Sequence, residues 1–440
     1  MHTPHPLAEP SAADSLPSVN LSHAGRVVGA ILDKALSGGE VTEAEGTRLL
    51  EATGAELLPL LAAADRLRAE AVGDRVTFVV NRNINFTNVC VKHCGFCAFS
   101  RGHTAGQGYF LPLEELVRRA GEAAALGATE VCVQAGLAPG LAPWFYVDMV
   151  RAIKQAHPGL HLHACSPEEV RYGADLAGVS VAEYLAALKD AGLGSLPGTS
   201  AEVLVDAVRQ RISPGRITVS DWLEVIRAAH RLAIPTTSTL MYGHLEQSRD
   251  IAAHLALLRN VQKETGGFTE FVPLGFVASE APMARHKPPA GLRGGPEGIE
   301  TLKLYAVARI LLHGYIPNIQ VSWVKEGEKL AQVGLMAGAN DLGGTLINES
   351  ISTAAGARHG QLLTPTRLRA LARGMGRVPA ERATDYRILR VFEDPAADPP
   401  DPLEGIADPV ARFGSYEDLI ARPEFRFRDV HRVRKHGGTD

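Results

Sequence analysis

Residues 85–101 read NFTNVCVKHCGFCAFSR and hold three of the five cysteines of the chain. Cys90, Cys94 and Cys97 have the spacing C-x3-C-x2-C. A structural zinc site or an electron-transfer iron-sulfur cluster is normally held by four protein ligands, and a fourth cysteine is missing here. His93 lies between the cysteines, where we expect the turn to point it away. Three thiolates around a four-iron cluster leave one iron open, as a reactive centre requires.

The cysteine stretch follows the first of several short β-rich segments that alternate with amphipathic helical segments. Repeated strand and helix units predict a parallel sheet, and eight units predict an α/β barrel of the TIM type. In such barrels the reactive groups lie at the carboxyl ends of the strands, and this is where the cysteines stand. The predicted strands are 76–80, 129–136, 160–167, 192–200, 234–243, 268–276, 318–323 and 338–345.

The segments outside this repeat have other patterns. Thr42 with Glu45, before the barrel, and Ser180 with Glu183, within it, match the S/T-x-x-E capping box that begins a helix. After residue 394 the chain is rich in Pro and Asp and then basic, which predicts a linker and a solvated tail. The expected organisation is a flexible leader (1–22), a helical region (23–75), the barrel (76–362), a C-terminal helical region (363–393) and the linker with its basic tail (394–440).

Composition excludes several classes of function. The chain has 440 residues, 45% hydrophobic and 21% charged, with a formal net charge of −4. It lacks the basic excess that binding to nucleic acid requires. No secretory start and no apolar run long enough for a membrane helix are visible, so we expect a cytoplasmic protein without a membrane partner. An odd number of cysteines argues against a disulfide framework.

The cysteine motif, with Phe96 before its last cysteine, resembles the signature of radical S-adenosylmethionine (SAM) enzymes. This resemblance implies that Cys90, Cys94 and Cys97 bind a four-iron, four-sulfur cluster. The amino and carboxylate groups of SAM would chelate the open iron. One electron from the reduced cluster would then break a carbon-sulfur bond, giving methionine and a 5'-deoxyadenosyl radical.

The resemblance extends to one family within this superfamily. The stretches NINFTNVCVKHCGFCAFSR, GATEVCVQAGL, HLHACSPEEV, GLGSLPGTSAEVL, STLMYGHLE, TGGFTEFVPLGF, NIQVSWVK and GANDLGGTLINESIS together resemble the second component of FO synthase, the CofH family. The similarity runs from about residue 25 to 392 and includes every predicted strand end.

The CofH resemblance implies a transferase of coenzyme F-420 biosynthesis. The adenosyl radical would take a hydrogen atom from the amino group of L-tyrosine, and the bond between its α and β carbons would break. The 4-hydroxybenzyl radical would add to 5-amino-6-(D-ribitylamino)uracil, and a partner of the CofG type would close the deazaflavin ring. Because only one C-x3-C-x2-C motif is present, we expect the separate CofH subunit rather than the fused enzyme.

Two alternatives stay open. Aminofutalosine synthase of menaquinone biosynthesis is similar through the cysteine region and MYGH, but tends to have PGGGAE where this chain has PGTSAE at 197–202. A non-catalytic iron-sulfur electron carrier or sensor belongs to another class. Such a carrier needs a fully ligated cluster and no polar-lined cavity.

Five residues are candidates for SAM binding. Gln134 and Gly136 stand where the superfamily often has GGE, whose backbone oxygens line the amino group of SAM, and the glycine permits close approach. Glu202 is expected to bind the ribose or amino group of SAM. The alternative is a purely structural role, as a carboxylate that the helix dipole favours in the first turn of a helix. The remaining two candidates are Phe96 and Ser166.

Residues near the predicted strand ends are candidates for substrate binding or proton transfer. His161 and His163 alternate along one strand and so share a face of the sheet. The substrate-binding candidates are His161, His163, Asn340 and Asp341, and those for a catalytic role are His163, Tyr242 and His244.

Overall fold

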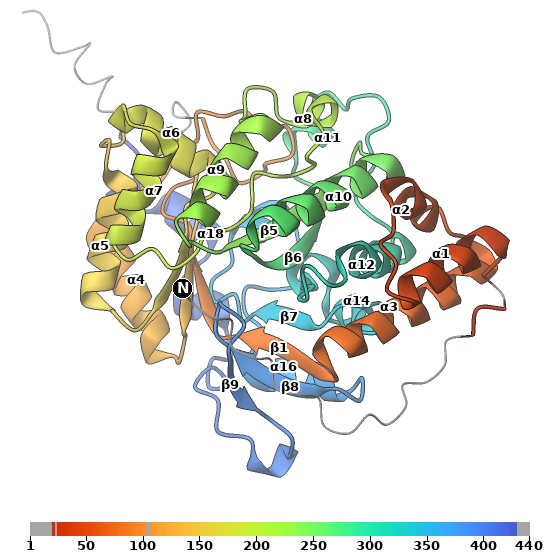
Figure 1. The fold of residues 1–440 in the computed structure, drawn as a ribbon. Coiled ribbons are helices and arrows are strands. Elements are labelled where there is room, and N and C mark those ends of the chain that lie inside the picture. Colours follow the sequence, from red (N-terminus) through yellow and green to blue (C-terminus); the bar gives the residue numbers. More distant parts are fainter. Residues whose placement is uncertain (1–19, 23, 103–105, 429–440) are drawn as a thin grey trace, which may run out of the picture.

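The computed structural model describes residues 20–22, 24–102 and 106–428, and parallel strands form its centre (Figure 1). β1 and β2 are one extended run whose neighbours change at Val80: β1 pairs with β7 and β2 pairs with β3. The strands are β1 (Arg75–Val79), β2 (Asn81–Ile84), β3 (Glu130–Val133), β4 (His161–Ala164), β5 (Thr236–Tyr242), β6 (Phe268–Gly275), β7 (Asp341–Gly344), β8 (Val378–Arg382) and β9 (Ile388–Val391).

Single parallel bridges complete the ring of strands. Residues 195–196 connect β4 to β5, and residues 319–320 connect β6 to β7. With these two positions, the run β1–β2, β3, β4, 195–196, β5, β6, 319–320 and β7 forms a closed ring of eight. The predicted barrel of the TIM type is confirmed.

Two of the eight predicted strands are much shorter than expected. In the segment 192–200, Pro197 has no N–H to donate, and a Cβ on Gly198 would lie 2.0 Å from the carbonyl oxygen of Thr237. In the segment 318–323, helix α13 begins at Trp323, directly after the bridge at 319–320. Both positions complete the ring without a regular ladder.

Helices surround the barrel, and the N-terminal helices pack beside α10 and α12 (Figure 1). The capping boxes of Thr42 with Glu45 and of Ser180 with Glu183 are both present. The longer helices are α1 (Arg26–Leu36), α2 (Glu43–Leu50), α3 (Leu57–Val72), α4 (Leu113–Ala125), α5 (Phe145–Ala156), α6 (Pro167–Ala177), α7 (Val181–Asp190), α8 (Asp206–Ile212), α9 (Val219–Arg231), α10 (Ser248–Thr265), α12 (Gly298–Leu312), α14 (Glu328–Gly334) and α16 (Pro365–Arg373). The short ones are α11 (Pro282–Arg285), α13 (Trp323–Glu326), α15 (Ile351–Ala354), α17 (Pro409–Phe413) and α18 (Tyr416–Ala421), with single turns η1 (Gly54–Glu56), η2 (Pro395–Ala397) and η3 (Pro423–Phe425).

The region 363–393, expected to be helical, contains one helix and then a β-hairpin. After α16, strand β8 pairs parallel with β1, and β9 returns antiparallel to β8. Arg382 of this hairpin binds Asp341 with Nε at 2.6 Å from Oδ2, and Thr384 donates to Glu130 at 2.7 Å. Asp341 and Glu130 are the first residues of β7 and β3, so the hairpin closes the amino end of the barrel.

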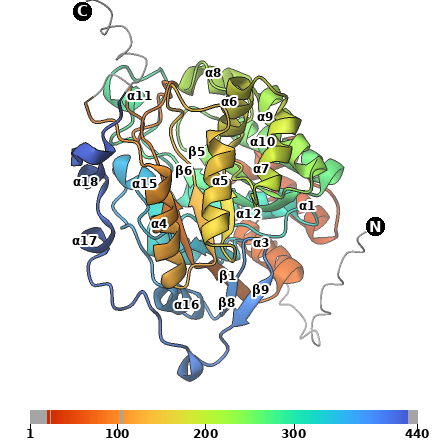
Figure 2. The ribbon, with the colours of Figure 1, turned by 90° about the vertical axis from the view of Figure 1, so that its left-hand side faces the viewer.

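Residues 394–428, which we call the C-terminal strap, pack against the barrel instead of forming only a linker and solvated tail. Figure 2 shows this blue segment running past α4 through α17 and α18. Tyr416 and Phe425 are buried, and the N–H of Phe110 donates to the carbonyl of Phe425 at 2.7 Å. The predicted leader lies almost wholly outside the described residues. Among the described helices, none combines the length and apolar character needed to span a membrane.

Candidate active site

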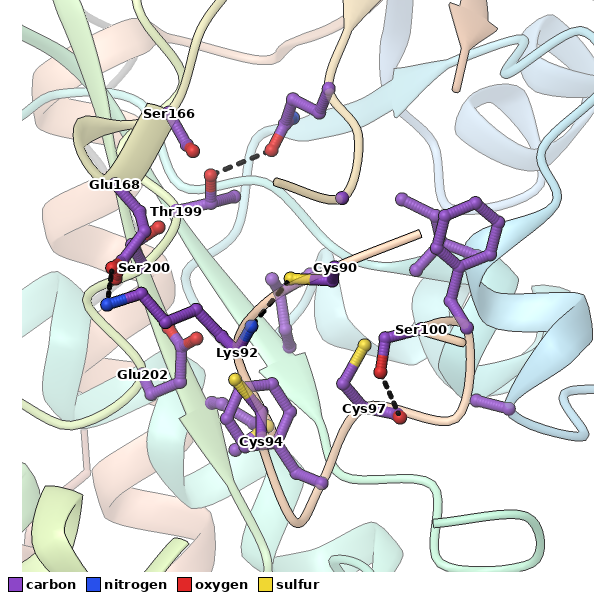
Figure 3. A pocket seen from close by; sticks show the side chains of 18 of the residues that line it. Cys90, Lys92, Cys94, Cys97, Ser100, Ser166, Glu168, Thr199, Ser200 and Glu202 are labelled. Atoms are coloured by element: carbon purple, nitrogen blue, oxygen red, sulfur yellow. Dashed lines mark hydrogen bonds and ion pairs between the residues drawn. The ribbon is translucent and has the colours of Figure 1, made fainter. Parts of the chain in front are cut away.

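The three cysteines lie on the loop after β2, at the carboxyl end of the barrel, and line one cavity. Figure 3 shows their sulfur atoms around a common space. Backbone hydrogen bonds hold this loop. The N–H of Gly95 donates to the carbonyl of Ile212 at 2.8 Å, and the N–H of Cys90 donates to the carbonyl of Arg101 at 3.1 Å. His93 is exposed, as its place in the turn predicts.

The donor set fits a cluster with one open iron. In the part of the chain that the structure describes, no three Cys, His, Asp or Glu side chains are grouped closely enough to hold a single metal ion. A four-iron cluster is larger, and each thiolate binds a different iron. Burial raises the pKa of the Cys90 thiol, and that of Cys94 to about 12, so binding of iron must displace protons from both.

The segment 134–136 forms the cavity wall beside the cysteines. Its Ala135 N–H donates to the Glu169 carboxylate at 3.1 Å, and the Gln134 side chain accepts from the Thr199 hydroxyl at 2.7 Å. At Gly136 an added Cβ would lie 2.3 Å from the carbonyl oxygen of Val89. The glycine therefore allows the cysteine loop to pack on this segment.

Ser166 also lines the cavity, as the cap of helix α6. Its N–H and hydroxyl donate to Glu169 at 2.7 and 2.6 Å. Burial raises the pKa of Glu169 to about 7 although these donors and the N–H of Ala135 oppose the rise. Glu169 is thus a positioning group that connects Ser166 to the 134–136 wall.

A charged cluster forms the wall nearest Cys94. Arg216 donates to Glu202 at 2.7 Å and to Glu168 at 2.9 Å, and Lys92 lies 3.3 Å from Glu168. Glu202 lies before helix α8, with a φ of 42°, and is not in the first turn of a helix. The Arg216 guanidinium also stands 5.9 Å from the centre of the Phe96 ring. The five predicted SAM residues therefore all line the same cavity as the cysteines.

His161 and His163 share a face of β4, as predicted, but neither lines this cavity. A nitrogen of each ring lies within hydrogen-bond distance of the Ser195 hydroxyl, at 2.8 Å for His161 and 2.7 Å for His163. Burial lowers the pKa of His163 to about 4, so its imidazole is neutral. His161 is the first residue of β4 and lies towards the amino end of the barrel.

Asn340 and Asp341 stand at the start of β7 and not at its end, so they too lie away from the cavity. The Asn340 side chain accepts from Arg309 at 2.8 Å and from the N–H of Ile319 at 2.8 Å. Asp341 pairs with Arg382. Gly343 and Gly344 belong to β7, so the strand continues past the two polar residues and these lie at its amino end.

Tyr242 and His244 also lie outside the cavity lining. Side chains alternate along β5, and Thr239 and Met241 point into the cavity. Tyr242 therefore faces outward, where its hydroxyl donates to Thr301 of α12 at 3.0 Å. His244 is buried, and one of its ring nitrogens lies 3.0 Å from the carbonyl oxygen of Met241.

Several residues that line the cavity were not predicted as site residues. Arg216 lies in the loop between α8 and α9, and only folding brings it to Glu202 and Glu168. Glu168 directly follows the SP pair after β4, a strand-end position that could have identified it. Residues that line the cavity and were not predicted as site residues include Lys92, Glu168, Thr199, Ser200 and Arg216.

Sequence comparisons identify close relatives. Residues 84–258 match the family model for the radical SAM superfamily, and residues 265–394 match the model for the CofH/MqnC C-terminal region. A 5-amino-6-(D-ribitylamino)uracil–L-tyrosine 4-hydroxyphenyl transferase of Methanothermobacter thermautotrophicus is 49% identical over 358 residues, covering 81% of this chain and 96% of that protein. The transferase of Methanopyrus kandleri is 48% identical, covering 79% and 94%.

Solved structures support the fold. Methylornithine synthase (PylB) superposes with a TM-score of 0.59 at 19% identity, covering 80% of this chain and 97% of that one. The hydrogenase maturase HydG of Carboxydothermus hydrogenoformans gives 0.61 at 16% identity, covering 81% and 80%. The sequence matches, which extend over nearly the whole length of the relatives, show that this chain belongs to the radical SAM family of 5-amino-6-(D-ribitylamino)uracil–L-tyrosine 4-hydroxyphenyl transferases.

Proposed function

We propose that this chain transfers the 4-hydroxybenzyl group of L-tyrosine to 5-amino-6-(D-ribitylamino)uracil in deazaflavin biosynthesis. The observation that carries the proposal is the 49% identity to a transferase of that name over 96% of its length. In the reaction the Cα–Cβ bond of tyrosine breaks, and a bond forms between the benzyl carbon and the uracil ring.

Cys90, Cys94 and Cys97 would hold a four-iron cluster, and the cavity beside them would hold SAM. When bound and reduced, this pair supplies the 5'-deoxyadenosyl radical that starts the reaction. Phe96, the 134–136 segment, Ser166 and Glu202 line the adjoining wall and are our candidates for contacts with SAM. Glu169 holds that wall through Ala135 and Ser166.

The apolar part of the cavity fits the aromatic side chain of the amino acid. Met241 from the end of β5 and Leu274 from the end of β6 line it, together with Phe276. Burial of a phenol ring against such side chains is favourable and excludes water from a reactive benzyl species. The cavity thus offers polar groups for the cofactor and apolar side chains for the substrate.

The product would pass to a separate radical SAM subunit of the CofG type, which closes the deazaflavin ring. A reducing compartment such as the cytoplasm fits the five cysteines, all of which are free thiols.

The test is anaerobic reconstitution with iron and sulfide, followed by SAM, dithionite, L-tyrosine and the ribitylaminouracil. Mass spectrometry should detect the hydroxybenzyl adduct, and Cys94→Ser should abolish it. An adduct from an aminofutalosine precursor and none from tyrosine would assign the chain to menaquinone biosynthesis. A visible cluster without release of 5'-deoxyadenosine would identify an electron carrier.

A further inference from the structure

The cations of the cavity differ in how they are paired. On the wall nearest Cys94, Arg216 and Lys92 share the carboxylates of Glu168 and Glu202. That wall is therefore close to charge balance before any ligand enters. Lys325 is the other cation of the lining, and it stands elsewhere in the ring.

Lys325 lies on α13, directly after the seventh position of the barrel, residues 319–320. The charged wall with Glu202 follows the fourth position, residues 195–196, so the two lie on different sides of the cavity. Trp323, two residues before the lysine, donates its indole N–H to the carbonyl of Gly344 at 3.0 Å. This buried anchor fixes the helix from which Lys325 extends.

The described residues offer the Lys325 ammonium a single hydrogen-bond partner and no ion pair. Its Nζ donates to the Ser352 hydroxyl at 3.2 Å. Glu349 is the nearby carboxylate, but its two oxygens accept from the N–H of Ser352 at 2.9 and 3.0 Å. Lys325 thus retains N–H donors that face the cavity.

A poorly compensated ammonium in such a place is energetically unfavourable. An anionic group entering the cavity would satisfy the remaining donors with charge-assisted hydrogen bonds. A carboxylate is an anionic group of this kind.

We propose that Lys325 binds the α-carboxylate of the amino acid substrate, L-tyrosine; this inference rests on the proposed function. Of the two substrates, only the amino acid carries a carboxylate, whereas the uracil presents neutral oxygens. SAM carries a second α-amino-acid carboxylate, but the family resemblance assigns that carboxylate to the open iron of the cluster. With its carboxylate at Lys325, tyrosine can place its ring against Met241 and Leu274, which line the same cavity.

The first test measures steady-state kinetics of adduct formation with reconstituted Lys325→Met and Lys325→Arg. Lys325→Met should raise the KM for tyrosine about 10- to 100-fold, the usual effect of losing a hydrogen bond to a charged group. The KM values for SAM and for the ribitylaminouracil should change little, and Lys325→Arg should restore much of the loss. Lys303→Met, a lysine of α12 that contacts the carbonyl of Ala52 away from the cavity, is the matched control.

The second test compares two ligands. Tyramine lacks the carboxylate, so the wild-type enzyme should bind it at least tenfold more weakly than tyrosine in competition, and Lys325→Met should remove this preference. Equal affinity of the wild type for both compounds, or a rise of the SAM or uracil KM in place of the tyrosine KM, overturns the inference alone. Absence of any adduct with the wild type overturns the proposed function and the inference with it.

Discussion

At the scale of single residues, the cavity depends on buried charges that compensate one another. Arg216 connects Glu168, in the first turn of helix α6, with Glu202, in the segment before α8, close to the buried Cys94. Neither carboxylate has enough contact with water to remain charged at low cost without the guanidinium. The arginine therefore determines the shape of the wall on which we place SAM.

Replacing Arg216 by Met should lower the free energy of unfolding by roughly 3–5 kcal/mol, because the buried Glu202 loses its ion-pair partner and Glu168 keeps only Lys92. Arg216→Lys should lower the free energy of unfolding by a smaller amount, since its ammonium keeps the positive charge but cannot contact both carboxylates. Denaturant titration measures the loss. Adding Glu202→Gln to Arg216→Met should recover part of it, and a loss below 1 kcal/mol in Arg216→Met would contradict this role.

Glu169 should make stability depend on pH. Its pKa rises from the ordinary 4.5 to about 7 on folding because of burial, so the folded protein holds the proton more tightly than the unfolded chain. The resulting stabilisation is full below about pH 4.5 and is lost as pH rises through about 7, a change on the order of 3 kcal/mol. Unfolding free energies of wild type and Glu169→Gln between pH 5 and 8 should therefore differ in slope. Parallel slopes would show that Glu169 does not titrate in this range.

At the scale of elements, two C-terminal segments close the barrel from different ends. The β8–β9 hairpin covers the amino end through Arg382. The C-terminal strap contacts the chain on both sides of the cysteines: Asn88, before them, donates to the Tyr416 hydroxyl at 2.9 Å, and the N–H of Phe427 donates to the carbonyl of Gly108, after them, at 2.9 Å. Only the strap reaches the loop that holds the cysteines.

Removal of the strap should expose the cysteine loop. A chain ending at residue 393 should lose its visible cluster absorbance in air several times faster than the full chain, because Phe99 and Tyr109 lose the packing of Tyr416. Tyr416→Phe keeps the ring and should lower the free energy of unfolding by about 1 kcal/mol, the usual contribution of one hydrogen bond. Circular dichroism checks that each variant is folded. Identical rates of cluster loss in the truncated and full chains would show that the strap does not protect the site.

The hairpin should matter for stability and not for catalysis. Arg382→Met leaves Asp341 without its ion pair and should lower the unfolding free energy by roughly 3–5 kcal/mol. The KM for tyrosine should stay unchanged in the folded enzyme, because neither residue lines the cavity. A raised KM for tyrosine with normal stability would indicate that Asp341 contributes to substrate binding after all.

At the scale of the whole molecule, the sequence predicted the barrel, the cysteine centre and the wall with Gln134 and Glu202. These follow from local patterns: strand and helix alternation, cysteine spacing, and polar residues after strands. The predicted place in the cavity was wrong for Asp341, because it depends on where β7 begins, and for Tyr242, because it depends on which face of β5 points inward. Arg216 and the packing of the strap depend on contacts between distant segments, which no local pattern records.

We propose that the three thiols at the carboxyl end of this barrel hold the cluster that starts radical cleavage of tyrosine. The most direct measurement follows the β carbon: reconstituted enzyme receives tyrosine labelled with ¹³C at that atom, and the products are analysed by mass spectrometry. We expect the label to appear in the uracil adduct and not in the two-carbon fragment, with 5'-deoxyadenosine formed alongside. An unlabelled adduct, or 5'-deoxyadenosine formation that leaves tyrosine intact, would contradict it.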